Sequence, residues 1–206
     1  MGSERKYLAD IMGSELPLKR VFDIAFAALG LTLLWPLIAV TWYMAGRDTG
    51  ASGFFCQKRG GRGGKPFKVV KLRTMRPVGG TTVTRAGDPR ITSLGAKLRR
   101  YKLDELPQLW NVLIGNMSFV GPRPDVPGFM DQLTGSDRKI LMLRPGITGP
   151  ATLKYRDEEE LLAGVDDPER YNAEVIWPDK VRINLEYLND WSLRKDIGYI
   201  VETVLR

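Results

Sequence analysis

The residues of this chain best suited to chemistry are two adjacent acids, Asp104 and Glu105, in the stretch YKLDELPQLWNVL. Basic residues surround the pair: Arg99, Arg100 and Lys102 before it and, after a run without any charge, Arg123. Pro107 stands at the head of the helix-like segment that follows, where its missing N–H costs nothing in a first turn. Adjacent carboxylates in such surroundings can bind a divalent cation or attack phosphorus.

The same pair has a purely structural interpretation, because Asp is a favoured helix N-cap and Glu is favoured in a first turn. With Asp104 as the N-cap, the pattern predicts a helix whose apolar face carries Leu106, Leu109, Trp110, Leu113 and Ile114. A helix N-terminus that keeps a carboxylate ionised also attracts phosphate oxygens. We therefore hypothesise that Asp104 is a nucleophile facing a phosphate and that Asp104 and Glu105 are Mg²⁺ ligands, with capping as the alternative.

The composition narrows the possible chemistry. The 206 residues suffice for one domain with an appendage, and the net charge of +7 favours an anionic partner or serves solubility alone. The chain has no histidine, which excludes catalysis by histidine and metal sites with histidine ligands. Cys56 is the only cysteine, which fits a reducing compartment. A metal, if present, is expected to have oxygen ligands, and Mg²⁺ is the natural candidate.

A membrane segment is predicted at residues 17–47, after a polar leader at 1–16 without a secretory cleavage site. No charge occurs from Ile24 to Gly46, which is long enough to cross a bilayer, although a buried core helix has the same pattern. Pro36 lies near the middle and should break or kink the helix. Both flanks are basic, so the positive-inside rule favours a re-entrant hairpin with both ends on the cytoplasmic side.

The remaining residues, 48–206, are predicted to form a small, mostly helical catalytic domain with one β-hairpin, giving an α+β protein. The hairpin strands are expected at Phe54–Gln57 and Phe67–Leu72, and the glycines between them indicate a turn and not a phosphate-binding loop. Helices are expected in ITSLGAKLRR, PDKVRINLEYLNDW and SLRKDIGYIVETVLR, the last capped by Ser192. The apolar row of that last helix suits a core or a membrane surface.

Several motifs together resemble the bacterial sugar transferases, the monotopic phosphoglycosyl transferases. The first is LDELPQLWNVLIGNMSFVGPRP, which carries the acid pair. The others are FFCQKRGGRGGKPFKVVKLRTM, RPGITG, and LKRVFD before the apolar segment. Together they cover about residues 17 to 150, and the chain matches the family's minimal form.

The resemblance implies transfer of a sugar-1-phosphate from a UDP-sugar to a polyprenol (undecaprenyl) phosphate, with release of UMP, as the first step of glycoconjugate assembly. It implies that Asp104 forms an aspartyl phosphosugar and that Glu105 assists Mg²⁺ or the acceptor. It further implies phosphate contacts by Arg99 and Arg123, with Lys71, Arg73 and Arg144 as further candidates for contacts to phosphate or nucleotide.

The resemblance also implies a location on the cytoplasmic face of the bacterial inner membrane, with lipid as a partner and without nucleic acid. The family's re-entrant helix is broken at a Ser-Pro pair, where this chain has Trp35 and Pro36, so a hydroxyl that could bind a freed carbonyl is missing. A nucleic-acid-binding module and a non-catalytic membrane scaffold remain the alternatives. The sequence leaves open the sugar, the polyprenol length and a homo-oligomeric state.

Overall fold

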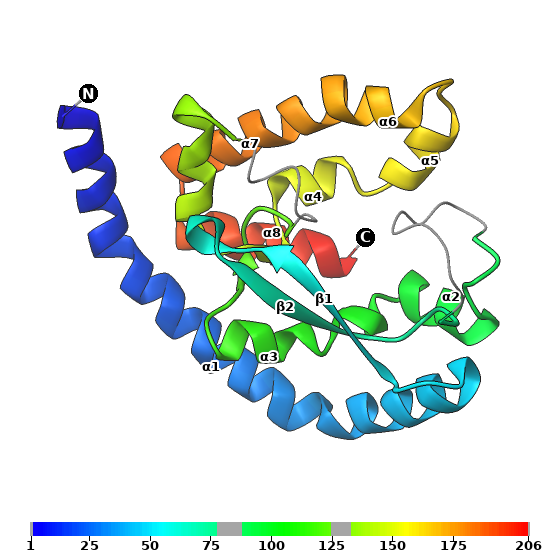
Figure 1. The fold of residues 1–206 in the computed structure, drawn as a ribbon. Helices are drawn as coiled ribbons and strands as arrows, with labels where there is room; N and C mark the ends of the chain where they lie inside the picture. The colour runs from blue at the N-terminus through cyan, green and yellow to red at the C-terminus, as the bar shows by residue number, and fades with distance from the viewer. Residues whose placement is uncertain (1, 78–87, 125–132, 206) are drawn as a thin grey trace.

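The computed structural model describes residues 2–77, 88–124 and 133–205, with the backbone alone for residues 2–16 and 159. These residues form an α+β structure that is mostly helical, as predicted, with a long N-terminal helix and two small sheets (Figure 1).

Helix α1 extends from Gly2 to Thr49 and contains Pro17 and Pro36. The predicted re-entrant helical hairpin is not seen. Instead, α1 is a single helix that bends around one side of the molecule (Figure 1), and the backbone of the expected leader at residues 2–16 belongs to it. A proline removes one backbone hydrogen bond, and a long helix accommodates that loss by bending. The break expected at Pro36 is therefore not an interruption of the helix.

The segment Pro17–Thr49 is long and apolar enough to cross a membrane, by length and composition. Two of its small side chains, Ala27 and Ala45, are buried against the rest of the protein. Its large apolar side chains are exposed, among them Leu18, Val21, Ile24, Phe26, Leu29, Leu33 and Trp35. A core helix would bury these side chains, so the pattern agrees with a membrane-associated helix.

The predicted β-hairpin is confirmed as an antiparallel pair of strands, with β1 at Phe54–Gly60 and β2 at Pro66–Leu72. Phe54 pairs with Leu72 and Gly60 with Pro66, so both strands extend further toward the turn than expected. The turn η1, Arg62–Gly64, is a 3₁₀ turn in which Gly63 has a φ of 68°. Glycine adopts this left-handed conformation without a Cβ clash, which explains the glycines between the strands.

The segment after the hairpin carries the acid pair. It consists of α2 (Ser93–Arg100), the 3₁₀ turn η2 (Leu103–Glu105), α3 (Gln108–Leu113) and the short strand β3 (Ser118–Val120). Strand β3 pairs in parallel with β4 (Gly146–Thr148), a second sheet that the sequence did not predict. Three-residue strands have too few side chains to produce a readable alternation.

The remaining elements form a helical layer over these strands (Figure 1). They are η4 (Gly135–Met142), α4 (Pro150–Lys154), α5 (Glu158–Ala163), α6 (Pro168–Tyr171), the π-helical turn η5 (Asn172–Ile176), α7 (Trp177–Asn189) and α8 (Leu193–Leu205). The expected helices at the positions of α2, α7 and α8 are confirmed. Ser192 caps α8 by accepting a hydrogen bond from the amide of Lys195, as predicted.

Three polar side chains of the LKRVFD motif attach α1 to the rest of the protein. Arg20 donates to the carbonyls of Val112 and Leu113 at the end of α3, at 2.6 and 2.7 Å. Asp23 accepts from the hydroxyl of Ser118 and the amide of Phe119, both at 3.1 Å. Lys19 forms a buried ion pair with Asp196 of α8.

The carboxylate of Asp196 also accepts hydrogen bonds from Tyr187 at 2.6 Å and from Trp191 at 3.0 Å. These contacts join the N-terminal and C-terminal helices, which are far apart in sequence.

Candidate active site

The acid pair lies in the turn η2 between α2 and α3, and Asp104 is not the N-cap that the sequence suggested. Helix α3 begins later, with Pro107 in the cap position and without a side-chain cap. Its buried face also differs from the expected one, because Gln108, Leu109, Asn111 and Val112 are buried whereas Trp110 and Ile114 are exposed. A 3₁₀ turn shifts the phase of the side chains relative to a continuous α-helix.

The turn begins at Lys102, which has a φ of 55° and is the one non-glycine residue with positive φ among those the structure describes. Left-handed backbone is costly for a side-chain-bearing residue and is often found where function requires a particular geometry. The turn that follows it, Leu103–Glu105, carries the two acids, and Asp104 is its buried residue. In the sequence, Lys102 stood out only as part of the basic surroundings and had no predicted role.

Glu105 is held between two cations from other segments. Lys71 of β2 donates to Glu105 Oε1 at 2.9 Å, and Arg123 donates to the same atom at 3.2 Å. Burial alone would raise the pKa of Glu105, but the charges of Arg123 and Lys71 outweigh it and hold the pKa well below its ordinary value. Glu105 is therefore ionised at neutral pH.

Asp104 has a different environment although it is the adjacent residue. Its side chain is buried, and Oδ1 has no hydrogen-bond partner among the residues that the structure describes. Burial, and after it the charge of Glu105, raise its pKa above the ordinary value, against the opposing charges of Lys71, Arg99 and Lys102. Two neighbouring carboxyl groups with pKa values moved in opposite directions are typical of a division of roles in catalysis.

Arg99 is placed beside the pair by α2. Thr92 caps this helix by accepting from the amide of Gly95 at 2.9 Å. Gly95 packs so tightly on the backbone of Thr74 that a Cβ there would lie 2.1 Å from the Thr74 carbonyl oxygen. Arg99 then donates to the Thr74 hydroxyl at 3.3 Å. The close packing of α2 on this segment fixes where the guanidinium lies.

Lys71 is positioned through Asn111, a residue that the motifs in the sequence did not single out. The Asn111 side chain accepts from the amide of Val70 at 2.9 Å and donates to the carbonyl of Lys68 at 2.7 Å. This bidentate contact holds β2 against α3. The signal available in the sequence was an amide side chain within an otherwise apolar helix, which must find hydrogen-bond partners when buried.

Two of the expected site residues lie elsewhere. Arg73 donates to the carbonyls of Ser52 at 2.7 Å and Phe54 at 3.4 Å, so its side chain turns toward the start of β1. Arg144 donates to the carbonyl of Gly115, beyond the far end of α3 from the acid pair. The structure thus brings together Asp104, Glu105, Lys71, Arg99 and Arg123, and separates Arg73 and Arg144 from them.

The acid pair partly fits a divalent cation. Among the described residues there is no group of three or more side chains of the types that bind metals. Asp104 Oδ1 has no hydrogen-bond partner within the described ranges, whereas the Oε1 atom of Glu105 accepts from Lys71 and Arg123. Mg²⁺ is commonly bound by one or two carboxylates together with substrate phosphates and water, and this donor set permits such binding.

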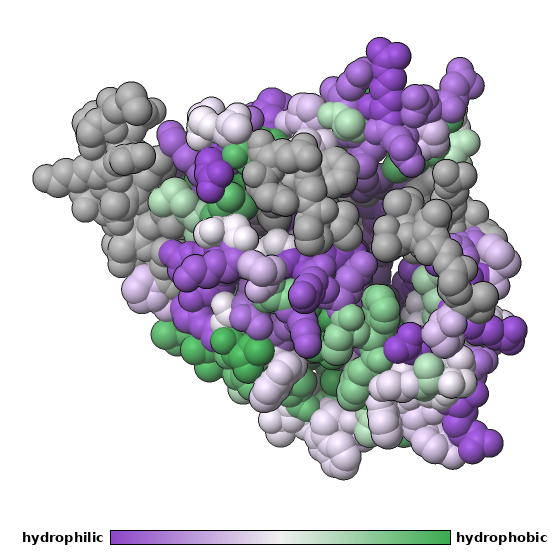
Figure 2. Space-filling view, viewed as in Figure 1, coloured by the Kyte–Doolittle hydropathy of each residue, from purple (hydrophilic) through white to green (hydrophobic). Residues whose placement is uncertain are grey.

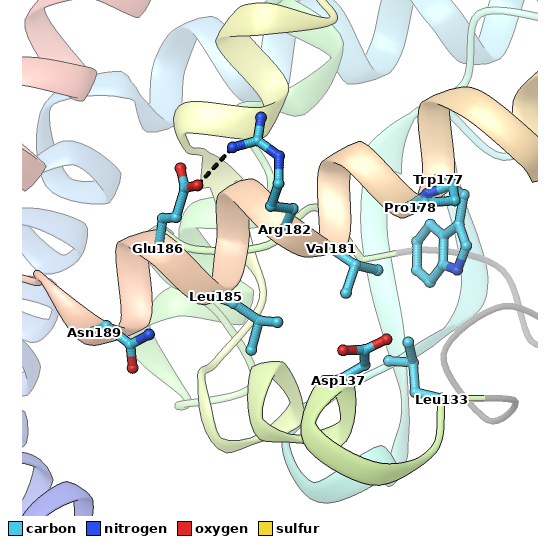
Figure 3. Close-up of a pocket in the computed structure, with 9 residues that line it drawn as sticks. All are labelled: Leu133, Asp137, Trp177, Pro178, Val181, Arg182, Leu185, Glu186 and Asn189. Carbon is cyan, nitrogen blue, oxygen red and sulfur yellow. Dashed lines mark hydrogen bonds and ion pairs between the residues drawn. The ribbon is translucent and has the colours of Figure 1, made fainter.

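A hollow of about 400 Å³ lies between η4 and α7 and does not include these residues (Figure 3). Leu133, Trp177, Val181 and Leu185 give it an apolar lining. Arg182 at its rim is bound to Glu186 at 2.5 Å. Arg182 also pairs with Asp179, so its guanidinium is engaged with acidic side chains.

Known proteins resemble this chain over nearly its whole length. Residues 14–206 match the model of the family described as bacterial sugar transferase. A Bacillus subtilis protein named as a putative undecaprenyl-phosphate N-acetylgalactosaminyl 1-phosphate transferase is 42% identical over 139 residues, which are 61% of this chain and 78% of that protein.

Two further relatives are named UDP-glucose:undecaprenyl-phosphate glucose-1-phosphate transferase. The one from Caulobacter vibrioides is 35% identical over 90% of this chain and 68% of its own length. The one from Escherichia coli is 35% identical over 97% of this chain but only 42% of its own length, so this chain spans less than half of that protein. The match of the family model and these identities, together with the acid pair and its basic neighbours, show that the chain belongs to the bacterial sugar transferase family.

Proposed function

We propose that the protein transfers a sugar-1-phosphate from a UDP-sugar to undecaprenyl phosphate and releases UMP, as the first membrane step in the assembly of a glycoconjugate. The names of the relatives support the donor and the acceptor. The observation that carries the proposal is the buried carboxylate of Asp104 beside Lys71, Arg99 and Lys102, with one oxygen that has no hydrogen-bond partner in the described part of the chain. This is a nucleophile with a set of cations that suits a diphosphate.

The proposed reaction has two displacements at the same phosphorus atom. A carboxylate oxygen of Asp104 forms a bond to the β-phosphorus of the UDP-sugar, and the bond from that phosphorus to the bridging oxygen breaks and releases UMP. A phosphate oxygen of undecaprenyl phosphate then attacks the aspartyl phosphosugar and restores the free carboxylate.

The cations have the role of neutralising the phosphates. Arg99 and Arg123 bind phosphate oxygens through their planar guanidinium groups, and Lys71 supplies a compact charge between β2 and Glu105. Mg²⁺ would be held by the carboxylates of Asp104 and Glu105 together with phosphate oxygens, and it would screen the charge of the diphosphate. Glu105 keeps Lys71 and Arg123 in place beside the nucleophile.

The site is proposed to act at the cytoplasmic face of the inner membrane. The exposed apolar side chains of Pro17–Thr49 would lie in lipid, and the bend of α1 would let both of its ends remain on the cytoplasmic side. This would place the acid pair within reach of a phosphate at the membrane surface, where undecaprenyl phosphate presents its charged group.

The decisive experiment mixes the enzyme with UDP-sugar in the absence of lipid. UDP-glucose, UDP-galactose and UDP-N-acetylgalactosamine are the donors to use. We expect a burst of at most one equivalent of UMP per enzyme and an added sugar-phosphate mass on the peptide containing Asp104. The Asp104→Asn variant should give neither.

Direct attack of the lipid phosphate on the UDP-sugar is the competing mechanism. It gives no UMP without lipid and no modified peptide. If a donor that is turned over in the presence of lipid produces neither signal, the covalent step is wrong although the transferase activity stands.

A further inference from the structure

Four arginines gather where the turn of the β-hairpin approaches the C-terminal end of α3: Arg20, Arg62, Arg138 and Arg144. Two of them meet at Gly115, where Arg144 Nε donates to the carbonyl at 3.0 Å and the Arg20 guanidinium lies against the backbone. Burial, and after it the charges of Arg62 and Arg20, hold the pKa of Arg144 below its ordinary value. These guanidinium groups are therefore close enough to repel one another.

The other two arginines line a hollow of about 320 Å³ between η1 and η4, together with Gly63, Leu141 and Met142. Gly63 has a φ of 68°, and a Cβ built there would meet no atom within 4 Å, so the hollow is open at the turn. The hollow combines two cations with two apolar side chains. A ligand with an anionic head and an apolar continuation matches that combination.

The positive charge of this cluster is not balanced from within. Among the residues that the structure describes, none of the four arginines forms an ion pair with a carboxylate. Asp23 is a carboxylate that attracts Arg144 electrostatically and raises its pKa, against the larger effects of burial and of Arg62 and Arg20. The Oδ1 atom of Asp23 accepts hydrogen bonds from Ser118 and Phe119. By contrast, Lys71 and Arg123 at the candidate active site share Glu105.

The cluster borders the apolar surface of α1. Arg20 lies on α1 itself, next to Leu18, Val21 and Ile24, whose side chains are 56%, 63% and 41% exposed. Figure 2 shows hydrophilic surface over the hairpin directly beside hydrophobic surface, and Figure 1 shows the hairpin turn next to η4 on the side along which α1 runs. If α1 lies in lipid, the arginines are at the level of the lipid phosphates, where basic residues are favoured.

We propose that Arg62 and Arg138, supported by Arg20 and Arg144, bind the phosphate of an anionic membrane phospholipid. The planar guanidinium groups suit phosphate oxygens, and Leu141 and Met142 suit the start of the acyl chains. This site is distinct from the proposed substrate site, because none of its arginines contacts the acid pair. Its role is to fix the depth and tilt of the protein at the membrane, and it rests on the proposed membrane association of α1.

The test uses all 206 residues in detergent micelles and counts bound lipid by native mass spectrometry. Dioleoyl-phosphatidylglycerol is the probe, and dioleoyl-phosphatidylcholine is the zwitterionic comparison. We expect selective binding of phosphatidylglycerol, and a loss of affinity of about tenfold or more in the double variant Arg62→Gln/Arg138→Gln. Both side chains are exposed, so the variant should fold, and thermal unfolding verifies this.

The matched control is Lys58→Gln/Lys68→Gln, which removes the same charge from facing positions of the same hairpin. This control should keep the wild-type affinity. Equal weakening in both variants, or no preference for phosphatidylglycerol, would overturn the site. Displacement of the lipid by inorganic phosphate or UDP at a similar concentration would show a site for soluble anions and also overturn it.

The outcome is independent of the proposed reaction. The Arg62→Gln/Arg138→Gln variant should retain UMP release in detergent, because neither residue belongs to the acid pair or its cations. If the wild-type protein binds phosphatidylglycerol selectively but releases no UMP with any UDP-sugar, the proposed function fails while the lipid site stands.

Discussion

At the scale of single residues, the main feature is that the protein raises the pKa of one of two neighbouring carboxyl groups and lowers the pKa of the other. Glu105 is paired with Lys71 and Arg123, whereas Asp104 is buried and one of its oxygens has no hydrogen-bond partner among the described residues. A buried carboxylate without a partner is costly to the fold, and such costs are typical of functional sites. Stability and activity should therefore respond to substitution of Asp104 in opposite directions.

For Asp104→Asn we expect turnover to fall by about a thousandfold or more, because the nucleophile is removed. We also expect the free energy of unfolding at pH 7 to rise by about 1 kcal/mol, because a disfavoured buried charge disappears. The folded pKa of Asp104 is raised above 3.8, so the cost of the charge arises as pH increases through that folded pKa. The stability difference should shrink as pH falls and Asp104 becomes protonated.

Chemical unfolding at two pH values together with UMP release measures both effects. Equal loss of activity and stability would instead show that Asp104 supports the fold. Substantial retained activity would show that another residue is the nucleophile.

For Glu105→Gln we expect a loss of about 1–3 kcal/mol in the free energy of unfolding, since Lys71 loses its anionic partner in a largely buried position. The control is Glu186→Gln, whose partner Arg182 is solvent-exposed, and its loss should be about 0.5 kcal/mol or less. Thermal unfolding of both variants in the same detergent gives the comparison. Similar effects of the two substitutions would mean that Glu105 is not structurally coupled to Lys71.

At the scale of elements, the position of α1 depends on buried polar contacts and not only on apolar packing. For Lys19→Met we expect a loss of about 3 kcal/mol, because the buried carboxylate of Asp196 is left without its ammonium partner. The double variant Lys19→Met/Asp196→Asn should lose less than the sum of the two single variants. Additive losses would contradict a direct interaction between α1 and α8.

The control for Lys19→Met is Lys195→Met on α8. Its partner Asp190 is largely exposed, so the change in unfolding free energy should be within about 0.5 kcal/mol. Thermal unfolding monitored by circular dichroism in detergent measures the stability of the two single variants, the double variant and this control.

At the scale of the whole molecule, α1 determines how the catalytic part meets the membrane. We expect both ends of α1 on the cytoplasmic side, since basic residues flank its apolar segment at both ends. The native Cys56 is exposed and reports the catalytic part, and the substitution Arg5→Cys in a Cys56→Ser background reports the N-terminus. In intact spheroplasts an impermeant thiol reagent should label neither, whereas both should react after lysis.

Labelling at position 5 alone would mean that α1 spans the bilayer. The variant Pro36→Leu should favour that outcome, because it restores the hydrogen bond to the carbonyl of Thr32 and removes a cause of bending.

Features that depend on local chemistry follow from the amino-acid sequence alone. The glycines between Phe54 and Leu72 require a turn, and Ser192 caps a helix through a contact three residues along the chain. The absence of histidine and the presence of an acid pair beside basic residues restrict the possible chemistry whatever the fold. The cap and the turn are readable because their hydrogen bonds form between near neighbours in the chain.

Which side chains meet depends on the tertiary structure. Lys71 and Arg123 reach Glu105 from 34 and 18 residues away, whereas Arg73 and Arg144, equally plausible in the sequence, bind backbone carbonyls elsewhere. The tertiary structure also keeps α1 continuous through Pro36 and places Asp104 in a 3₁₀ turn instead of a helix cap. These outcomes depend on how α2, α3 and the hairpin pack, because the partners of a charged side chain are set by the segments that surround it and not by its neighbours in the chain.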